Sequence, residues 1–282
     1  MDLFNGRRLV IATMHGKEQV IAPILEEALG VEVVVPNMSN FNTDTFGTFS
    51  GEIERTLDPV ETARHKCIAA CKAMNETLAV ASEGSFGPHP ALMFIPADEE
   101  LILLRDTLND IEIGAQITST NTNFGGEEVH SWEALKTFAT NAGFPEHGLI
   151  LRDAKDSKKH ICKGITSWSE LENKFRDILS FKSSAFAETD MRAHLNPTRM
   201  QIIALATKKL VEKVKACCPS CGTPGFDVTD IKEGLPCSLC KLPTKSIRSL
   251  VYKCKKCNHS SEKLYPKGKT EEDPMFCDNC NP

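Results

Sequence analysis

The stretch Leu78-Ala-Val-Ala-Ser-Glu-Gly-Ser-Phe-Gly-Pro-His-Pro90 decides the fold of the main part of this 282-residue chain. Leu78 to Ala81 form a continuous apolar run, which is typical of a strand buried on both faces of a sheet. Two glycines and two prolines follow, so we expect the strand to open at Ser82 into a polar turn that carries Glu83. Ligands of open α/β sheets bind at the carboxyl ends of strands, which makes Glu83 a candidate site residue. A solvated turn carboxylate is the alternative.

Periodicity and capping signals on either side of this stretch predict alternating strands and helices. In chain order we expect strands at 8–13 and 31–35 around a helix at 17–29, a helix at 59–74, strands at 91–95, 101–104 and 111–118, helices at 132–141 and 168–181 around a strand at 148–151, and a helix at 197–215. The first strand–helix–strand unit predicts a parallel pair. The strands after residue 90 are expected as antiparallel hairpins, with Asp98 and Glu99 as solvated carboxylates in a turn.

Composition and charge indicate a folded, two-unit chain. The chain is 41% hydrophobic and 25% charged, and its length exceeds that of a typical single domain. No apolar run reaches the roughly 18 residues that span a bilayer, and the first residues lack an export-signal pattern, so we expect a cytoplasmic protein without membrane contact. Residues 208–282 carry 14 Lys/Arg against 9 Asp/Glu although the whole chain has a net charge of −5. This basic end permits nucleic-acid contact without requiring it.

Eight of the 12 cysteines lie after residue 217 in four Cys-x-x-Cys pairs. The pairs are Cys218/Cys221, Cys237/Cys240, Cys254/Cys257 and Cys277/Cys280. In a chain without an export signal this spacing favours metal ligands over disulfides and predicts two structural zinc sites with four cysteines each. Successive pairs sharing a metal is the simplest arrangement, and a nested one, in which the first and last pairs share a metal, is the alternative.

The fold class that we predict is therefore α/β, with a mixed central sheet flanked by helices and a small C-terminal zinc-ribbon module. The expected boundaries are a main domain at 1–195, a connecting helix at 196–216 and the two-zinc ribbon module at 217–282.

Three polar residues outside the cysteine pairs are further site candidates, beside Glu83. Lys17 lies where a strand ends and a helix begins, which suits a phosphate or carboxylate, and an ordinary helix cap is the alternative. Asp44 lies in a long, glycine-dotted loop. Mg²⁺ favours a few carboxylates plus phosphate oxygens, and it could be held by two or three of Asp44, Glu52, Glu83, Asp98 and Glu99. Solvated turn carboxylates are the alternative, which we favour for Asp98 and Glu99. Arg192, together with Arg199, is a candidate clamp for an anionic substrate, or part of an Arg/Asp network at a domain junction.

Across nearly its whole length the chain resembles a bacterial family known only as a domain of unknown function. The matching segments are Ala12-Thr-Met-His-Gly-Lys-Glu18, Asn42-Thr-Asp-Thr-Phe-Gly-Thr-Phe-Ser-Gly-Glu52, Ala81-Ser-Glu-Gly-Ser-Phe-Gly-Pro-His-Pro90, Glu188-Thr-Asp-Met-Arg192, Asn196-Pro-Thr-Arg-Met200 and the cysteine knuckles. This resemblance implies no activity.

A second resemblance covers about the first 120 residues. The order of strand, Gly-Lys turn, helix, strand, long loop, Glu-Thr-Ala-Arg-His-Lys-Cys helix and acidic Gly turn is similar to the inosine triphosphate pyrophosphatase fold. The resemblance implies that Lys17 contacts phosphates and that Glu61 and Glu83 bind Mg²⁺. The chain departs from that family in having Ser-Glu-Gly-Ser in place of a paired-Asp turn, and its helix lacks the family's Asn.

These features lead to two functional hypotheses. The first is a Mg²⁺-dependent hydrolase of a nucleotide or other phosphate-bearing small molecule, with a site built from Lys17, Asp44, Glu83 and Arg192. The second is a module without catalysis that binds nucleic acid or a protein through the zinc ribbons. The basic surface that this second hypothesis needs is formed by Lys241, Lys245, Arg248, Lys253, Lys255 and Lys256, with Tyr252 nearby.

Overall fold

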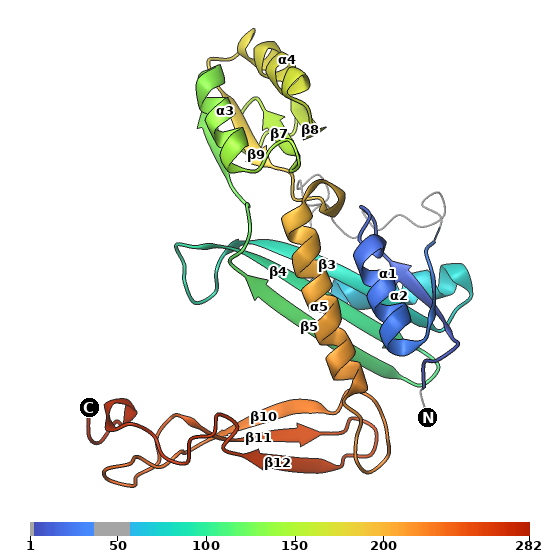
Figure 1. Cartoon of the computed structure of the whole chain (residues 1–282), viewed down its shortest axis with the longest axis vertical. Helices are drawn as coiled ribbons and strands as arrows, with labels where there is room; N and C mark the ends of the chain where they lie inside the picture. Colours follow the sequence, from blue (N-terminus) through green and yellow to red (C-terminus); the bar gives the residue numbers. More distant parts are fainter. Residues whose placement is uncertain (1–2, 37–56) are drawn as a thin grey trace. The chain divides into compact units, whose positions relative to one another are not determined.

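The computed structural model describes residues 3–36 and 57–282, and the chain divides into two compact units, residues 1–211 and 212–282 (Figure 1). Asp44, predicted as a site residue, and Glu52, a possible Mg²⁺ ligand, lie outside the described residues. The helix that we expected to connect two domains is α5, Pro197–Lys215, and the boundary between the units falls within it.

The central sheet of the first unit is mixed, as predicted. Its strands are β1 (Arg8–Ala12), β2 (Glu32–Val34), β3 (Leu78–Pro88), β4 (Pro96–Asp106) and β5 (Ile111–Ser119), in the order β2-β1-β3-β4-β5. β1 pairs in parallel with both β2 and β3, whereas β3, β4 and β5 form an antiparallel meander. The parallel pair predicted from the first strand–helix–strand unit is therefore confirmed.

The expected turn at Ser82 is wrong, because β3 continues through it to Pro88. The antiparallel ladder with β4 runs from Leu78, opposite Asp106, to Pro88, opposite Pro96. The reversal of the chain lies at residues 89–95 instead, where the predicted strand was also wrong. The strand can contain the polar residues and glycines that suggest a turn, because the hydrogen bonds of the ladder join backbone N–H and C=O groups and do not depend on the side chains. Asp98 and Glu99 consequently lie within β4 and not in a turn.

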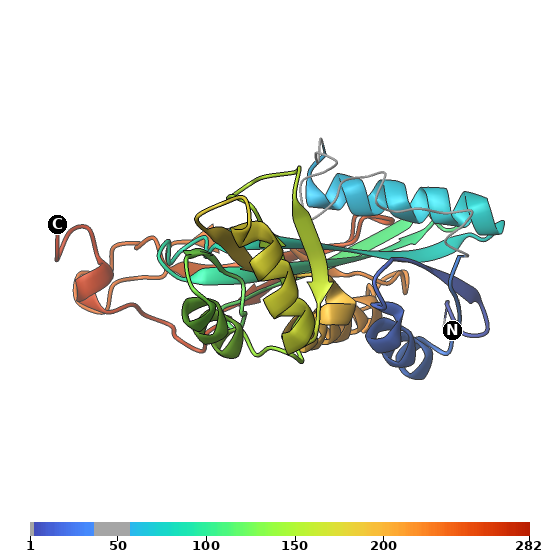
Figure 2. The same cartoon turned by 90° about the horizontal axis from the view of Figure 1, so that it is seen from above.

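Helices cover both faces of this sheet (Figure 2). α2 (Pro59–Met74) packs Ala63, Cys67 and Ala70 against the face formed by the alanines of β3 and by Leu103. α1 (Glu18–Leu29) and α5 lie over the opposite face, in front of the sheet in Figure 1. Because successive strand residues point to opposite faces, each polar residue in β3 and β4 is assigned to one of these two layers.

The rest of the first unit is a smaller sheet with its own core. Its strands are β6 (Gly126–Val129), β7 (Leu149–Arg152), β8 (Ile161–Ile165) and β9 (Ala185–Thr189), in the order β6-β9-β7-β8, packed with α3 (Trp132–Asn141) and α4 (Trp168–Leu179). The two helices and β7 agree with the predicted elements. β6, β8 and β9 were not predicted, because four or five residues give too short a pattern for period-two alternation to emerge.

The second unit is organised around a three-stranded antiparallel sheet. Its strands are β10 (Asp227–Glu233), β11 (Ile247–Lys253) and β12 (Ser260–Leu264), in the order β10-β11-β12. The cysteine pairs lie in the segments that precede, connect and follow these strands.

The start of α2 offers a direct test of helix capping in this fold. Asp58 accepts hydrogen bonds from the backbone N–H groups of Val60 (2.8 Å) and Glu61 (2.9 Å). We expect Asp58→Ala to lower the free energy of unfolding by about 1 kcal/mol, because two helical N–H groups lose their acceptor. Urea unfolding followed by circular dichroism measures this. The control is Glu172→Ala, which removes an exposed i,i+4 pair with Arg176 and should cost less than about 0.5 kcal/mol.

Candidate functional site

The eight paired cysteines form two quartets in the second unit. Among residues 3–36 and 57–282, these are the only groups of three or more His, Cys, Asp or Glu whose ligand atoms all lie within 4.8 Å of one another. The first quartet is Cys218, Cys221, Cys254 and Cys257, and the second is Cys237, Cys240, Cys277 and Cys280.

Each Cys-x-x-Cys pair folds into a knuckle with a repeated hydrogen-bond pattern. In all four knuckles the amide of the residue after the second cysteine donates to the carbonyl of the first, as in Gly222 to Cys218 at 2.8 Å. In the first three knuckles that residue has a left-handed backbone, with φ of 71° at Gly222, 62° at Lys241 and 58° at Asn258. The turn therefore follows from local backbone geometry, and it directs both thiols of a pair to the same side.

Distances between sulfurs indicate a metal site. Cys218 and Cys257 are 3.7 Å apart at Sγ, and Cys240 and Cys277 are 3.5 Å apart. A disulfide requires about 2.05 Å, whereas four thiolates about 2.3 Å from a tetrahedral ion lie roughly 3.8 Å from one another. Both quartets thus have the spacing of a tetrathiolate metal centre with all four positions taken by protein.

The pairing of the knuckles is interleaved, so both predicted arrangements were wrong. The first knuckle shares a quartet with the third, and the second with the fourth. The sheet explains this, because Asp227 at the start of β10 pairs with Lys253 at the end of β11. The knuckles that precede β10 and follow β11 therefore meet at one end of the sheet. At the other end, Leu264 at the close of β12 pairs with Ser249 near the start of β11.

A second candidate site is a cluster of buried charges on the α1 and α5 face of the central sheet. Lys17, just before α1, donates from Nζ to Ser82 Oγ at 2.9 Å. Arg199 of α5 donates from Nε to Glu100 Oε1 at 2.6 Å. All four of these side chains are buried, as is Asp98 on the same face of β4.

Gly84 is what allows Arg199 to reach this face. Arg199 lies across β3, with its guanidinium carbon 4.9 Å from the centre of the Phe86 ring. A Cβ atom at Gly84 would lie 2.6 Å from Glu100 Oε1 and closer still to Arg199 Nη2. The glycine that we interpreted as part of a turn is therefore required for close approach within a strand.

Burial lowers the pKa of Lys17 to about 8. The cause is the loss of hydration of its ammonium group, and the positive charge of Arg199 acts in the same direction, whereas Glu100 and Glu83 oppose it. A buried lysine with a pKa this close to neutral pH is typical of functional sites.

On the opposite face of β3, Glu83 forms a buried ion pair with Lys66 of α2 at 2.5 Å. Glu83 therefore lies at the centre of the charged region but in the other layer from Lys17. Lys66 was not predicted as a site residue, because within α2 it reads as an exposed helix position.

The turn between β1 and α1 brings two histidines next to Lys17. His15 and Gly16 both have left-handed backbone, with φ of 66° and 74°. The His15 ring stacks on His194 with 5.3 Å between ring centres. A non-glycine residue in this conformation is uncommon and is often found at functional sites.

The remaining predicted residues are engaged elsewhere in the first unit. Arg192 donates from Nη2 to Asp190 at 2.6 Å, as in the Arg/Asp network that we gave as the alternative. Glu61 lies in the first turn of α2 and pairs with Arg64, which also binds Glu112 at 2.6 Å. The residues missed on this face were Ser82, Gly84 and Glu100. The signal for them was the i,i+2 spacing of Ser82 with Gly84 and of Glu100 with Asp98, which places each pair on one strand face.

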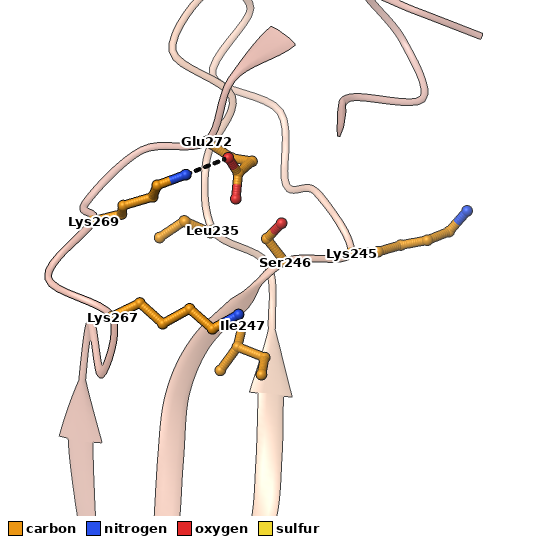
Figure 3. Close-up of a pocket in the computed structure, with 7 residues that line it drawn as sticks. All are labelled: Leu235, Lys245, Ser246, Ile247, Lys267, Lys269 and Glu272. Carbon is orange, nitrogen blue, oxygen red and sulfur yellow. Dashed lines mark hydrogen bonds and ion pairs between the residues drawn. The ribbon is translucent and has the colours of Figure 1, made fainter. Parts of the chain in front are cut away.

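The second unit contains a pocket of about 300 Å³ with a basic lining (Figure 3). Its lining residues are Leu235, Lys245, Ser246, Ile247, Lys267, Lys269 and Glu272. Lys269 pairs with Glu272 at 3.3 Å, and Lys245, which points away from the other side chains, pairs with Asp278 at 2.8 Å. Lys267 makes no ion pair with any described residue.

A family model described as a domain of unknown function, DUF6671, matches residues 66–282. The chain belongs to this family. The resemblance to such a family is therefore confirmed. No curated protein matches the chain.

The DUF6671 match covers Lys66, Glu83, the β4 carboxylates, Arg199 and all eight paired cysteines, whereas Lys17 and Glu61 lie before it. No helix in the described part of this DUF6671 chain has the length and apolar character needed to cross a membrane.

The interleaved pairing can be tested by metal content. In protein reconstituted with Zn²⁺, we expect Cys218→Ser combined with Cys254→Ser to leave about one metal per chain, because both changes fall in one quartet. Cys218→Ser combined with Cys237→Ser should lose both metals. Elemental analysis of the purified full-length variants measures this. The reverse result, with more metal in the second variant, would support successive pairing.

Proposed function

We propose that the first unit is a hydrolase of a nucleotide or other phosphate-bearing small molecule, and that the second unit is a structural module holding two zinc ions. For zinc, the support is the donor set, since four thiolates at tetrahedral spacing are typical of structural zinc. The full set of protein ligands leaves no open position, so we assign no catalytic role to these ions.

The observation that carries the hydrolase proposal is the buried group of Lys17, Ser82 and Arg199 beside the N-terminus of α1. The N-terminus of a helix favours anions through its dipole, and a lysine next to it adds a full positive charge. This group lies where β1 ends, which is where ligands of open α/β sheets bind. In this proposal Lys17 and Arg199 bind the phosphate, and His15 and His194 flank the site.

The pair of Mg²⁺ ligands implied by resemblance to the inosine triphosphate pyrophosphatase fold does not fit the contacts of those residues. Glu61 is paired with Arg64, and Glu83 is paired with the buried Lys66. A cation at either carboxylate would have to compete with an ammonium or guanidinium group already in contact. We therefore derive no role in hydrolysis from a metal at Glu61 and Glu83.

A second candidate function is nucleic-acid binding by the zinc module. The pocket containing Lys267 and the exposed Lys253, Lys255 and Lys256 favour it. Overall charge does not, because residues 212–282 contain 12 Lys/Arg and 9 Asp/Glu, and two zinc ions with eight thiolates would contribute about −4. Binding would have to depend on local basic patches.

Replacing Lys17 should test the hydrolase proposal. We expect Lys17→Met to lower turnover at least about 100-fold, because it removes the charge beside the bound phosphate and keeps the aliphatic chain. The measurement is release of phosphate and pyrophosphate from ordinary and deaminated nucleoside triphosphates with Mg²⁺. Lys208→Met, on the exposed side of α5, is the matched control.

Two results would contradict this proposal. One is unchanged turnover in Lys17→Met, and the other is no turnover by folded, zinc-loaded wild-type protein on any substrate of the panel. Glu83→Gln is best combined with Lys66→Met, because changing Glu83 alone leaves a buried ammonium group unpaired, which costs roughly 3–5 kcal/mol.

For the second candidate, full-length protein is titrated against a fluorescent single-stranded oligonucleotide at several salt concentrations. Binding through phosphates should weaken with salt, and Lys267→Gln should lower the magnitude of the slope of log K against log salt by about 1. Lys232→Gln is the control, because Lys232 is already paired with Glu262 at 2.6 Å. Affinity that is constant between low and high salt would exclude this mode of binding.

A further inference from the structure

Two carboxylates of β4 are buried together with too few hydrogen-bond donors around them. Asp98 and Glu100 are two residues apart and therefore point to the same face of the sheet, toward α5. Their exposed fractions are 1% and 0%. Both oxygens of Asp98 and Oε2 of Glu100 accept no hydrogen bond from an N–H or hydroxyl donor of the described residues, whereas Glu100 Oε1 accepts one from Arg199.

Such a pair is costly to bury. An ionised carboxylate out of water requires hydrogen bonds or an opposite charge, and buried polar atoms without partners are rare enough in native proteins to indicate a missing water or ion. The two carboxyl groups also hydrogen-bond each other when Asp98 is protonated. Burial raises the pKa of Asp98 to about 7, and the negative charge of Glu100 contributes to this rise. The negative charge of Glu100 repels the ionised form of Asp98.

The positive groups nearby do not use these three oxygens. Arg199 donates to the other oxygen of Glu100 and to the backbone carbonyl of Met191. Lys17 donates to Ser82. These three carboxylate oxygens, which are hard metal ligands, lie on one strand face beside the residues that we propose to bind phosphate.

We propose that Asp98 and Glu100 bind a divalent cation of the Mg²⁺ or Mn²⁺ class through these oxygens. Mg²⁺ is commonly held by one or two carboxylates, with water and substrate phosphate oxygens completing its octahedron. The use of the cation in catalysis rests on the proposed hydrolase function, but its binding does not. This site differs from Glu61 and Glu83 because no cation of the described residues is paired with Asp98, and because Glu100 binds Arg199 through Oε1 alone.

The test is direct binding of Mn²⁺ to zinc-saturated, full-length protein, followed by the electron paramagnetic resonance signal of free Mn²⁺. Saturation with zinc first keeps Mn²⁺ out of the cysteine quartets. We expect one Mn²⁺ per chain, displaced by Mg²⁺, and an affinity at least about tenfold lower in Asp98→Asn, because an amide is a weaker and neutral ligand.

Glu99→Gln is the matched control. Glu99 lies between the two residues in sequence, but its side chain points to the other face and accepts a hydrogen bond from Thr118 at 3.1 Å. The affinity of the Glu99→Gln protein for Mn²⁺ should therefore stay within about twofold of wild type. If Asp98→Asn does not fold, the number of Mn²⁺ ions bound per wild-type chain still tests the proposal, because a wild-type protein that binds no Mn²⁺ overturns it.

Equal Mn²⁺ affinity in Asp98→Asn and wild type would also overturn it. If Asp98→Asn has the Mn²⁺ affinity of wild type but is more stable than wild type above pH 7, the two carboxyl groups share a proton and bind no cation. Binding of Mn²⁺ without any nucleotide hydrolysis would contradict the proposed function and leave the cation site standing. Hydrolysis without Mn²⁺ binding would contradict the cation site and leave the proposed function standing.

Discussion

The antiparallel ladder between β3 and β4 is the constraint on which the first unit depends. Eleven residues of each strand pair without interruption, from Leu78 opposite Asp106 to Pro88 opposite Pro96. The inner half of this ladder is apolar, and the outer half carries Ser82, Glu83, Asp98 and Glu100. Continuous pairing is what keeps those polar residues buried, because a turn at Ser82 would have released them into solvent. The same ladder separates them into two layers, with Lys66 on one side and Lys17 and Arg199 on the other.

Elements with strong local signals could be predicted from the sequence. The α2 helix begins and ends where its Asp-Pro cap and apolar stripe place it, and β1 and β2 pair in parallel as a strand–helix–strand unit requires. The cysteine spacing likewise predicts tetrathiolate sites, since each knuckle is a local turn. In these cases the information lies within a few residues of the element itself.

Features that depend on distant partners could not be predicted in the same way. The course of β3 beyond Ala81 is decided by β4, and a Ser-Glu-Gly-Ser stretch read alone has the composition of a turn. The closeness of Lys17 to Ser82 and of Arg199 to Glu100 joins segments 65 and 99 residues apart. The pairing of the knuckles follows from the register of β10 and β12 on β11, and the spacing of the cysteines does not predict that register.

Interleaving of the two quartets sets the order in which the two sets of ligands are completed during synthesis. The first quartet is complete once Cys257 has been made, when β10 and β11 already exist and β12 does not. The second is complete only once Cys280 has been made. A nascent chain can therefore close one end of the sheet around a metal while the other end is still open. A chain cut short after β12 would retain one complete set of ligands and two unmatched thiols at the opposite end.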